Sequence, residues 1–131
     1  MATPFPNPTD GELAILRVLW SRKAPMTVRE VHAVLSRGKD TAYTTVLKML
    51  TIMAEKGLVR RDDSERSHTY RATHGEAVVQ ASLLKDLMRR AFSGSALSLV
   101  QRALDDEMAS AEDIQAISKL IAQAKAKRKD R

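Results

Sequence analysis

The segment DTAYTTVLKMLTIMAEKGLVRRDDSERSHTYRA (residues 40–72) changes its hydrophobic period part-way, and this change decides the fold. Its first half has helical spacing, with an expected inner face of Val46, Met49 or Leu50, and Met53. Asp40 or Thr41 is the expected N-cap of this helix, and Gly57 is the expected C-cap. Beyond Gly57 the period falls to two, so LVRR, DDSE and RSHTYRA predict a strand, a polar turn and a second strand.

Two more helices are predicted upstream, each opened by the same signal. TDGE and TVRE place Thr9 and Thr27 three residues before Glu12 and Glu30, the spacing of a capping box. The helices should run from there to about Trp20 and to near Gly38. Three helices followed by a short basic hairpin predict a winged helix-turn-helix DNA-binding domain over residues 1–74, in a chain that is mainly α with a small β-hairpin.

The third predicted helix opens with short side chains that can approach DNA closely, and free N–H groups at a helix start attract phosphate. Lys48, one turn later, is placed for a phosphate or a guanine edge. Basic hairpin residues would follow the backbone, and His68 would be packed or face phosphate. The alternative is that the threonines only cap the helix and meet solvent. The expected DNA-binding residues are Thr41, Ala42, Tyr43, Thr44, Thr45, Lys48, Arg60, Arg61, Arg66, His68 and Arg71.

Residues 75–131 predict a helical dimerisation region that ends in a basic tail. The stretches GEAVVQASLLKDLMRRAF and SALSLVQRALDDEM flank the breaker FSGS, and Ser110 with Asp113 marks a further helix start. These helices have more apolar face than a small winged domain can cover, so a second copy is the expected partner, although packing onto the chain's own N-terminal domain is the alternative. The expected seam consists of Leu83, Leu87, Leu97, Val100, Leu104, Ile114, Ile117 and Ile121.

Composition and charge narrow the function further. The 131 residues carry a net charge of +6 and no cysteine, which excludes disulfides and thiolate metal sites. The positive charge lies in residues 1–74 and in the tail KAKRKDR (125–131), which could contact phosphates or a membrane or remain solvated. We expect a cytoplasmic protein, since no run is long enough to span a membrane and the N-terminus lacks signal-peptide features.

No catalytic or metal-binding pattern is present in the sequence. His32, His68 and His74 lack the spacing of a metal site, so we predict neither an enzyme nor a cofactor or metal. Double-stranded DNA and a second copy of the chain are the expected partners. A winged-helix module for protein interaction, or a nonspecific DNA-binding protein, is the alternative function.

The order of five segments resembles the penicillinase-repressor (BlaI/MecI) family over roughly residues 8–122. They are PTDGELAILRVLW, TVREVHAVL, AYTTVLKMLTIMAEKGLV, RSHTYRA and FSGSALSLVQRALDDE. The resemblance implies a homodimeric repressor on dyad operators, derepressed when a membrane sensor metalloprotease, or a protease downstream of it, cleaves the dimerisation helices. Ala42 to Thr45 match the start of the family's recognition helix, with Lys48 on its exposed side, and Arg66, His68 and Tyr70 match its wing.

The chain departs from the family pattern at three points. Ile52 stands where many members have arginine, which removes one possible backbone contact. The step that corresponds to the staphylococcal cleavage site is Arg102–Ala103 instead of Asn–Phe, so a different cleavage specificity is expected. The paired cysteines of a copper-responsive branch are absent.

Overall fold

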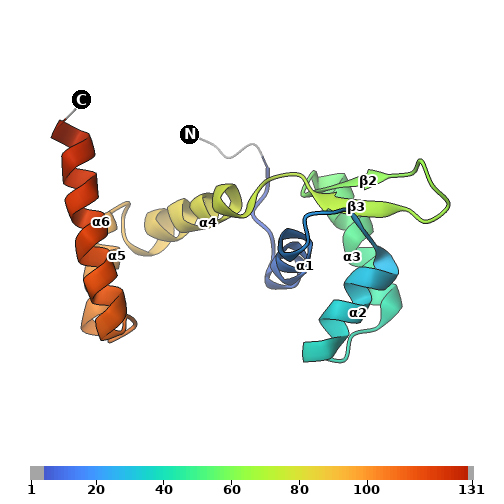
Figure 1. Cartoon of the computed structure of the whole chain (residues 1–131), viewed down its shortest axis with the longest axis horizontal. Helices are drawn as coiled ribbons and strands as arrows, with labels where there is room; N and C mark the ends of the chain where they lie inside the picture. The colour runs from blue at the N-terminus through green and yellow to red at the C-terminus, as the bar shows by residue number, and fades with distance from the viewer. Residues whose placement is uncertain (1–4, 130–131) are drawn as a thin grey trace. The chain divides into compact units, whose positions relative to one another are not determined.

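A computed structural model of the chain describes residues 5–129 (Figure 1). Asp130 and Arg131, the end of the predicted basic tail and of its domain, lie outside the described residues, as do residues 1–4 of the predicted N-terminal domain. The chain divides into two compact units, Met1–Leu84 and Lys85–Arg131.

The N-terminal unit is a winged helix. It contains α1 (Asp10–Ser21), β1 (Met26–Thr27), α2 (Val28–Gly38), α3 (Tyr43–Lys56), β2 (Val59–Asp62), β3 (Thr69–Ala72) and the first half of α4 (Glu76–Ala91). The three strands form an antiparallel sheet in the order β1-β3-β2. The predicted helices and hairpin are confirmed, whereas the two-residue strand β1 was not predicted, because two residues carry no periodic signal.

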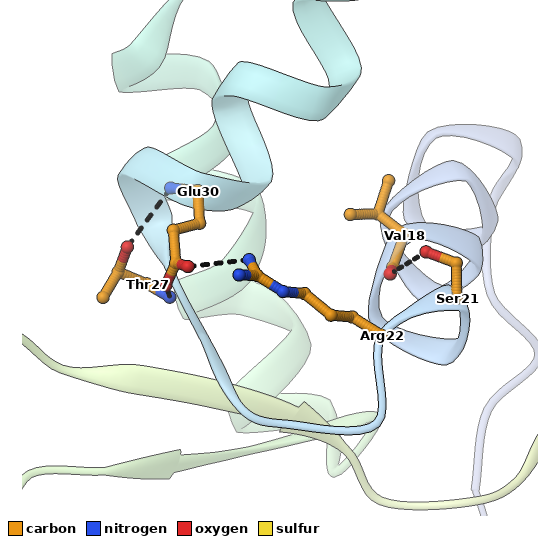
Figure 2. A network of polar contacts seen from close by, with 5 residues as sticks. All are labelled: Val18, Ser21, Arg22, Thr27 and Glu30. Atoms are coloured by element: carbon orange, nitrogen blue, oxygen red, sulfur yellow. Dashed lines mark hydrogen bonds and ion pairs between the residues drawn. The ribbon is translucent and has the colours of Figure 1, made fainter.

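Both predicted capping boxes form, and the second also links α1 to α2. The Glu30 N–H donates to Thr27 Oγ1 at 3.2 Å, and the Thr27 N–H donates to Glu30 Oε1 at 3.0 Å. Arg22, just after α1, reaches the other carboxylate oxygen of Glu30 at 2.7 Å (Figure 2). Hydrogen bonding from the Thr27 backbone, aided by Arg22, outweighs desolvation and lowers the pKa of Glu30. These contacts fix the chain at the entry to the helix-turn-helix.

The start of α3 differs from the sequence prediction. Its N-cap is Ala42, which offers no side-chain hydrogen bond, rather than Asp40 or Thr41. The Thr41 hydroxyl donates instead to the Lys39 carbonyl at 3.0 Å, so it is directed away from the helix amides. The predicted end is confirmed: Gly57 adopts φ 82°, and its N–H and that of Leu58 return to the last carbonyls of α3.

One hydrophobic core joins the helices to the inner face of the sheet. The predicted face of α3 is confirmed, with Val46, Leu50 and Met53 fully buried. On α1 the buried hydrophobic side chains are Ile15, Leu16, Val18 and Leu19. The buried hydrophobic residues of the unit are Phe5, Ile15, Leu16, Val18, Leu19, Met26, Val28, Val31, Val46, Leu50, Met53, Leu58, Val59, Tyr70 and Val79.

The first turns of α4 pack on the winged helix, so the compact unit extends ten residues beyond the expected boundary at residue 74. Val79 is buried in the core, and the Ser82 hydroxyl donates to Asn7 Oδ1 at 2.6 Å. The Trp20 indole N–H donates to the His74 carbonyl at 3.0 Å. Leu83 is partly buried against the same core, which leaves it less available for dimerisation than the sequence suggested.

The C-terminal unit contains the rest of α4, then α5 (Ala96–Asp105) and α6 (Ala111–Lys129). Ser93 and Gly94 end α4 with positive φ angles, and the Ser95 hydroxyl caps α5. Ser110 and Asp113 form the reciprocal cap predicted for α6. Within residues 5–129 no helix is both long and apolar enough to cross a membrane.

Candidate nucleic-acid interface

The outward face of α3 is a polar stripe. Thr44, Lys48, Thr51 and Glu55 recur at spacings of three and four, are all exposed, and lie opposite the buried Val46 and Leu50. The Thr51 hydroxyl donates to the Leu47 carbonyl at 2.9 Å. The stripe therefore presents two threonines and one cation, which suit the major groove of DNA, and the Glu55 carboxylate near the end of α3.

The flank of α3 nearest the wing, which is the hairpin of β2 and β3, is apolar and exposed. Tyr43 and Leu47, one helical turn apart, are 44% and 41% exposed. They line a hollow of about 550 Å³ together with Arg29 at the start of α2 and with Arg66 and His68 of the wing. The hollow brings residues of the helix-turn-helix and the wing to one surface.

Arg29, Leu47 and Thr51 were not among the predicted DNA-binding residues. Leu47 could have been found from the sequence, because it falls outside the stripe of Val46 and Leu50. Thr51 could also have been found, one turn beyond Lys48 on the same face. Arg29 becomes a candidate only when the fold brings α2 and the wing together.

Three cations of this surface are available for an anionic partner. Among residues 5–129, Arg29, Lys48 and Arg66 form no ion pair. His68, by contrast, has Nδ1 3.3 Å from the Asp63 carboxylate.

The wing arginines are divided between two hollows. Strand pairing places Arg60 directly opposite Arg71, on the sheet face that carries Thr69, whereas Arg61 pairs with Tyr70 on the other face. Two like charges opposite each other destabilise a strand pair unless an anion lies near them. Arg60, Arg61 and Arg71, with Pro25, line a second hollow of about 350 Å³, and Arg66 lines the first.

Asp63 partly neutralises the tip of the wing. Its carboxylate lies 2.8 Å from Arg61 Nε, and its charge raises the pKa of the Arg61 guanidinium. Asp62 accepts a hydrogen bond from the Ser64 N–H at 2.9 Å, which lowers its own pKa and shapes the turn. Within residues 5–129, Arg61 therefore has a carboxylate partner and Arg66 has none.

The C-terminal unit leaves most of its predicted seam uncovered. Leu97 is 76% exposed, and no residue of α5 or α6 is buried. Of the predicted seam residues, only Leu83 and Ile117 are partly covered; Leu87, Leu97, Val100, Leu104, Ile114 and Ile121 are exposed. The predicted cleavage step, Arg102–Ala103, lies inside α5, so a protease that binds extended chains needs this helix to unwind locally.

The described part of the chain contains no cluster of side chains that could hold a metal ion. No group of three or more His, Asp or Glu side chains gathers there.

A family model described as penicillinase repressor matches residues 8–123. The chain belongs to the penicillinase repressor family. A "Transcriptional regulator BlaI" of Mycobacterium tuberculosis is 43% identical over 82 residues, and the match covers 63% of this chain and 59% of that relative. A "Penicillinase repressor" of Bacillus licheniformis is 22% identical over 126 residues, 96% of this chain and 98% of that protein.

A solved structure shares the fold of the N-terminal unit. The solution structure of the DNA-binding domain of the repressor BlaI matches with a TM-score of 0.51 at 23% identity, covering 59% of this chain and 93% of that structure. The match shows the winged-helix fold.

Proposed function

We propose that this chain is a sequence-specific DNA-binding transcriptional repressor. The observation that carries the proposal is the single surface made by the polar stripe of α3 and the hollow beside it, where Arg29, Lys48 and Arg66 have no carboxylate partner among the described residues. Short side chains on an exposed helix can reach base edges, and unpaired cations around them bind phosphate. The name of the mycobacterial relative, a transcriptional regulator, agrees with this role.

Within this surface the residues have different tasks. Tyr43, Thr44, Thr45 and Lys48 are proposed to read base edges, with Thr41 and Ala42 close to the backbone. The Leu47 side chain can contact a thymine methyl group or a sugar. The phosphate contacts are proposed to come from Arg29, Arg66 and His68 of this surface, and from Arg60, Arg61 and Arg71 of the second hollow.

The exposed apolar helices support a homodimer as the active form. Leu97, Val100 and Leu104 recur along one side of α5, and Ile114 and Ile121 do so along α6. Burial of such side chains in a second copy is the largest favourable term available to them. A two-fold dimer carries two α3 helices and so predicts a dyad operator with half-sites one DNA turn, or a multiple of it, apart.

Proteolysis in the dimerisation region is the proposed route to derepression, with a membrane sensor metalloprotease as the candidate upstream partner. Cutting α5 near Arg102–Ala103 would divide the apolar face and leave the winged helix whole. Each monomer would then bind a half-site alone and lose the gain that linked binding provides.

The test is to retain genomic DNA fragments on the purified protein at physiological salt with excess competitor, and to sequence them. Recovery of a few promoter fragments that share a dyad supports the proposal and identifies the regulated genes. Uniform recovery would indicate nonspecific binding, and no recovery would favour a protein-interaction module.

A further inference from the structure

His32, on α2, contacts the backbone at the start of the recognition helix. Its Nε2 lies 2.6 Å from the carbonyl oxygen of Thr41, the residue before the N-cap of α3. Its ring also meets the Tyr43 ring edge-on, with centroids 5.8 Å apart and planes at 76°. One side chain therefore contacts both the residue before the N-cap and the first residue of α3.

This contact occurs where α3 lacks the usual means of fixing its start. Helices α1, α2 and α5 have Thr9, Thr27 and Ser95 as caps, and each cap accepts a backbone N–H through its side chain. Ala42 has no such group, and the first hydrogen bonds of α3 run from Thr45 and Val46 to its carbonyl. The amides of Tyr43 and Thr44 thus precede the first helical bond.

The absence of a side-chain cap has a functional use if DNA supplies the acceptor. Unbonded N–H groups at a helix start are a ready phosphate site, which a capping Asp or Thr would partly occupy. The direction of the first turn must then be set from outside the helix. Among residues 5–129, His32 is the side chain outside the turn that hydrogen-bonds its backbone.

We propose that His32 is a positioning residue for DNA readout. Its N–H holds the Thr41 carbonyl, and its ring orients Tyr43, so that the first turn of α3 faces the duplex before binding. The inference rests on the proposed function, because it assigns the orientation of the reading surface. A proton on Nε2 is present in one neutral tautomer and in the imidazolium, so the bond does not depend on the charge of the ring.

Two substitutions separate the two contacts of the imidazole. His32→Gln keeps an N–H donor and removes the ring, whereas His32→Phe keeps a ring against Tyr43 and removes the donor. Ala33→Ser, an exposed position on the same helix, is the matched control. All three are made in the full chain.

The first measurement is made without DNA. We expect the backbone amide resonances of Thr41 to Thr45 to shift in His32→Phe and to remain near wild type in Ala33→Ser, with an unchanged thermal midpoint. In His32→Gln most of these amide resonances should stay near their wild-type positions. Unshifted amides in His32→Phe would overturn the positioning role, whether or not the chain binds DNA.

The second measurement is the ratio of affinities for a retained dyad fragment and for random DNA. One hydrogen bond predicts a loss of about 3- to 10-fold in dyad affinity for His32→Phe, little change on random DNA, and partial rescue by His32→Gln. Equal losses on both DNAs, or a loss that follows a lower thermal midpoint, would overturn the inference. A wild-type protein without any preferred fragment would instead refute the proposed function, and the amide measurement would still test His32.

Discussion

Replacing Glu12 with glutamine should weaken the N-terminal unit by an amount that depends on pH. Glu12 is 4% exposed, and its carboxylate accepts the Thr9 N–H at 2.9 Å and Lys56 Nζ at 2.8 Å. The pair joins the first turn of α1 to the last turn of α3. Glutamine keeps an acceptor for Thr9, so Glu12→Gln isolates the charge.

The size of the effect follows from the surroundings of the two groups. A hydrogen bond between charged groups contributes about 1.5–3 kcal/mol, but the Lys56 side chain is 35% exposed and partly screened, so about 1–2 kcal/mol is expected. For a domain of this size that loss lowers the thermal midpoint by roughly 4–8 °C per kcal/mol.

The pH dependence has a definite sign. Burial alone raises the pKa of Glu12, but its hydrogen bonds to Lys56 and Thr9 and the Lys56 charge outweigh burial and lower it below the ordinary 4.5. A depressed pKa stabilises the fold above the unfolded value, and the gain is lost as the pH falls through the folded value. The difference between wild type and Glu12→Gln should therefore be full at pH 7 and shrink below about pH 4.

The assay is urea unfolding, monitored by the fluorescence of Trp20. Trp20 is the single tryptophan and lies in the N-terminal unit, so it reports on that unit alone. Lys56→Gln is the control: it leaves the buried carboxylate without its cation, and the double variant should lose less than the sum of the two single ones. A Glu12→Gln loss that is equal at pH 7 and pH 3 would refute the role of charge.

The other predictions concern DNA binding and assembly. Tyr43→Ala or Thr45→Ala should weaken binding to the dyad site by about 5-fold or more and binding to random DNA less, in competition assays; equal losses would contradict base readout by α3. Arg66→Ala should weaken both kinds of binding. It should also reduce the slope of the logarithm of the binding constant against the logarithm of the salt concentration by about one, and an unchanged slope would exclude a phosphate contact. Leu104→Glu should convert dimer to monomer by light scattering, whereas Ser98→Glu, exposed on the same helix, should not. A variant Leu104→Glu with the wild-type mass would place the seam elsewhere.

Local signals in the sequence predicted most of the winged helix. The capping boxes at Thr9 and Thr27 and the left-handed Gly57 depend on residues within four positions of each other, so the sequence alone contains them. The inner face of α3 was also predictable, since Val46, Leu50 and Met53 repeat at the helical period.

Features that depend on distant partners were not predictable in the same way. Ala42 is the N-cap of α3 because the Thr41 hydroxyl donates to the Lys39 carbonyl instead of capping the helix. The sequence does not show which of these hydrogen bonds the hydroxyl forms. Strand β1 forms because Met26 and Thr27 pair with Tyr70 and Thr69 more than forty positions away. The opposed arrangement of Arg60 and Arg71, and the place of Arg29 beside the wing, follow from strand register and helix packing.

The left-handed turn at Gly57 has a consequence for how new specificity could arise or be engineered. It passes the chain from α3 into β2 through only two residues, Gly57 and Leu58, so α3 and both strands of the wing belong to one uninterrupted segment, residues 42–72. Exchange of that segment between family members would transplant both elements proposed to bind DNA in a single recombination event. The graft should fold where its inward positions, such as Val46, Leu50 and Tyr70, suit the recipient core, because those side chains are fully buried.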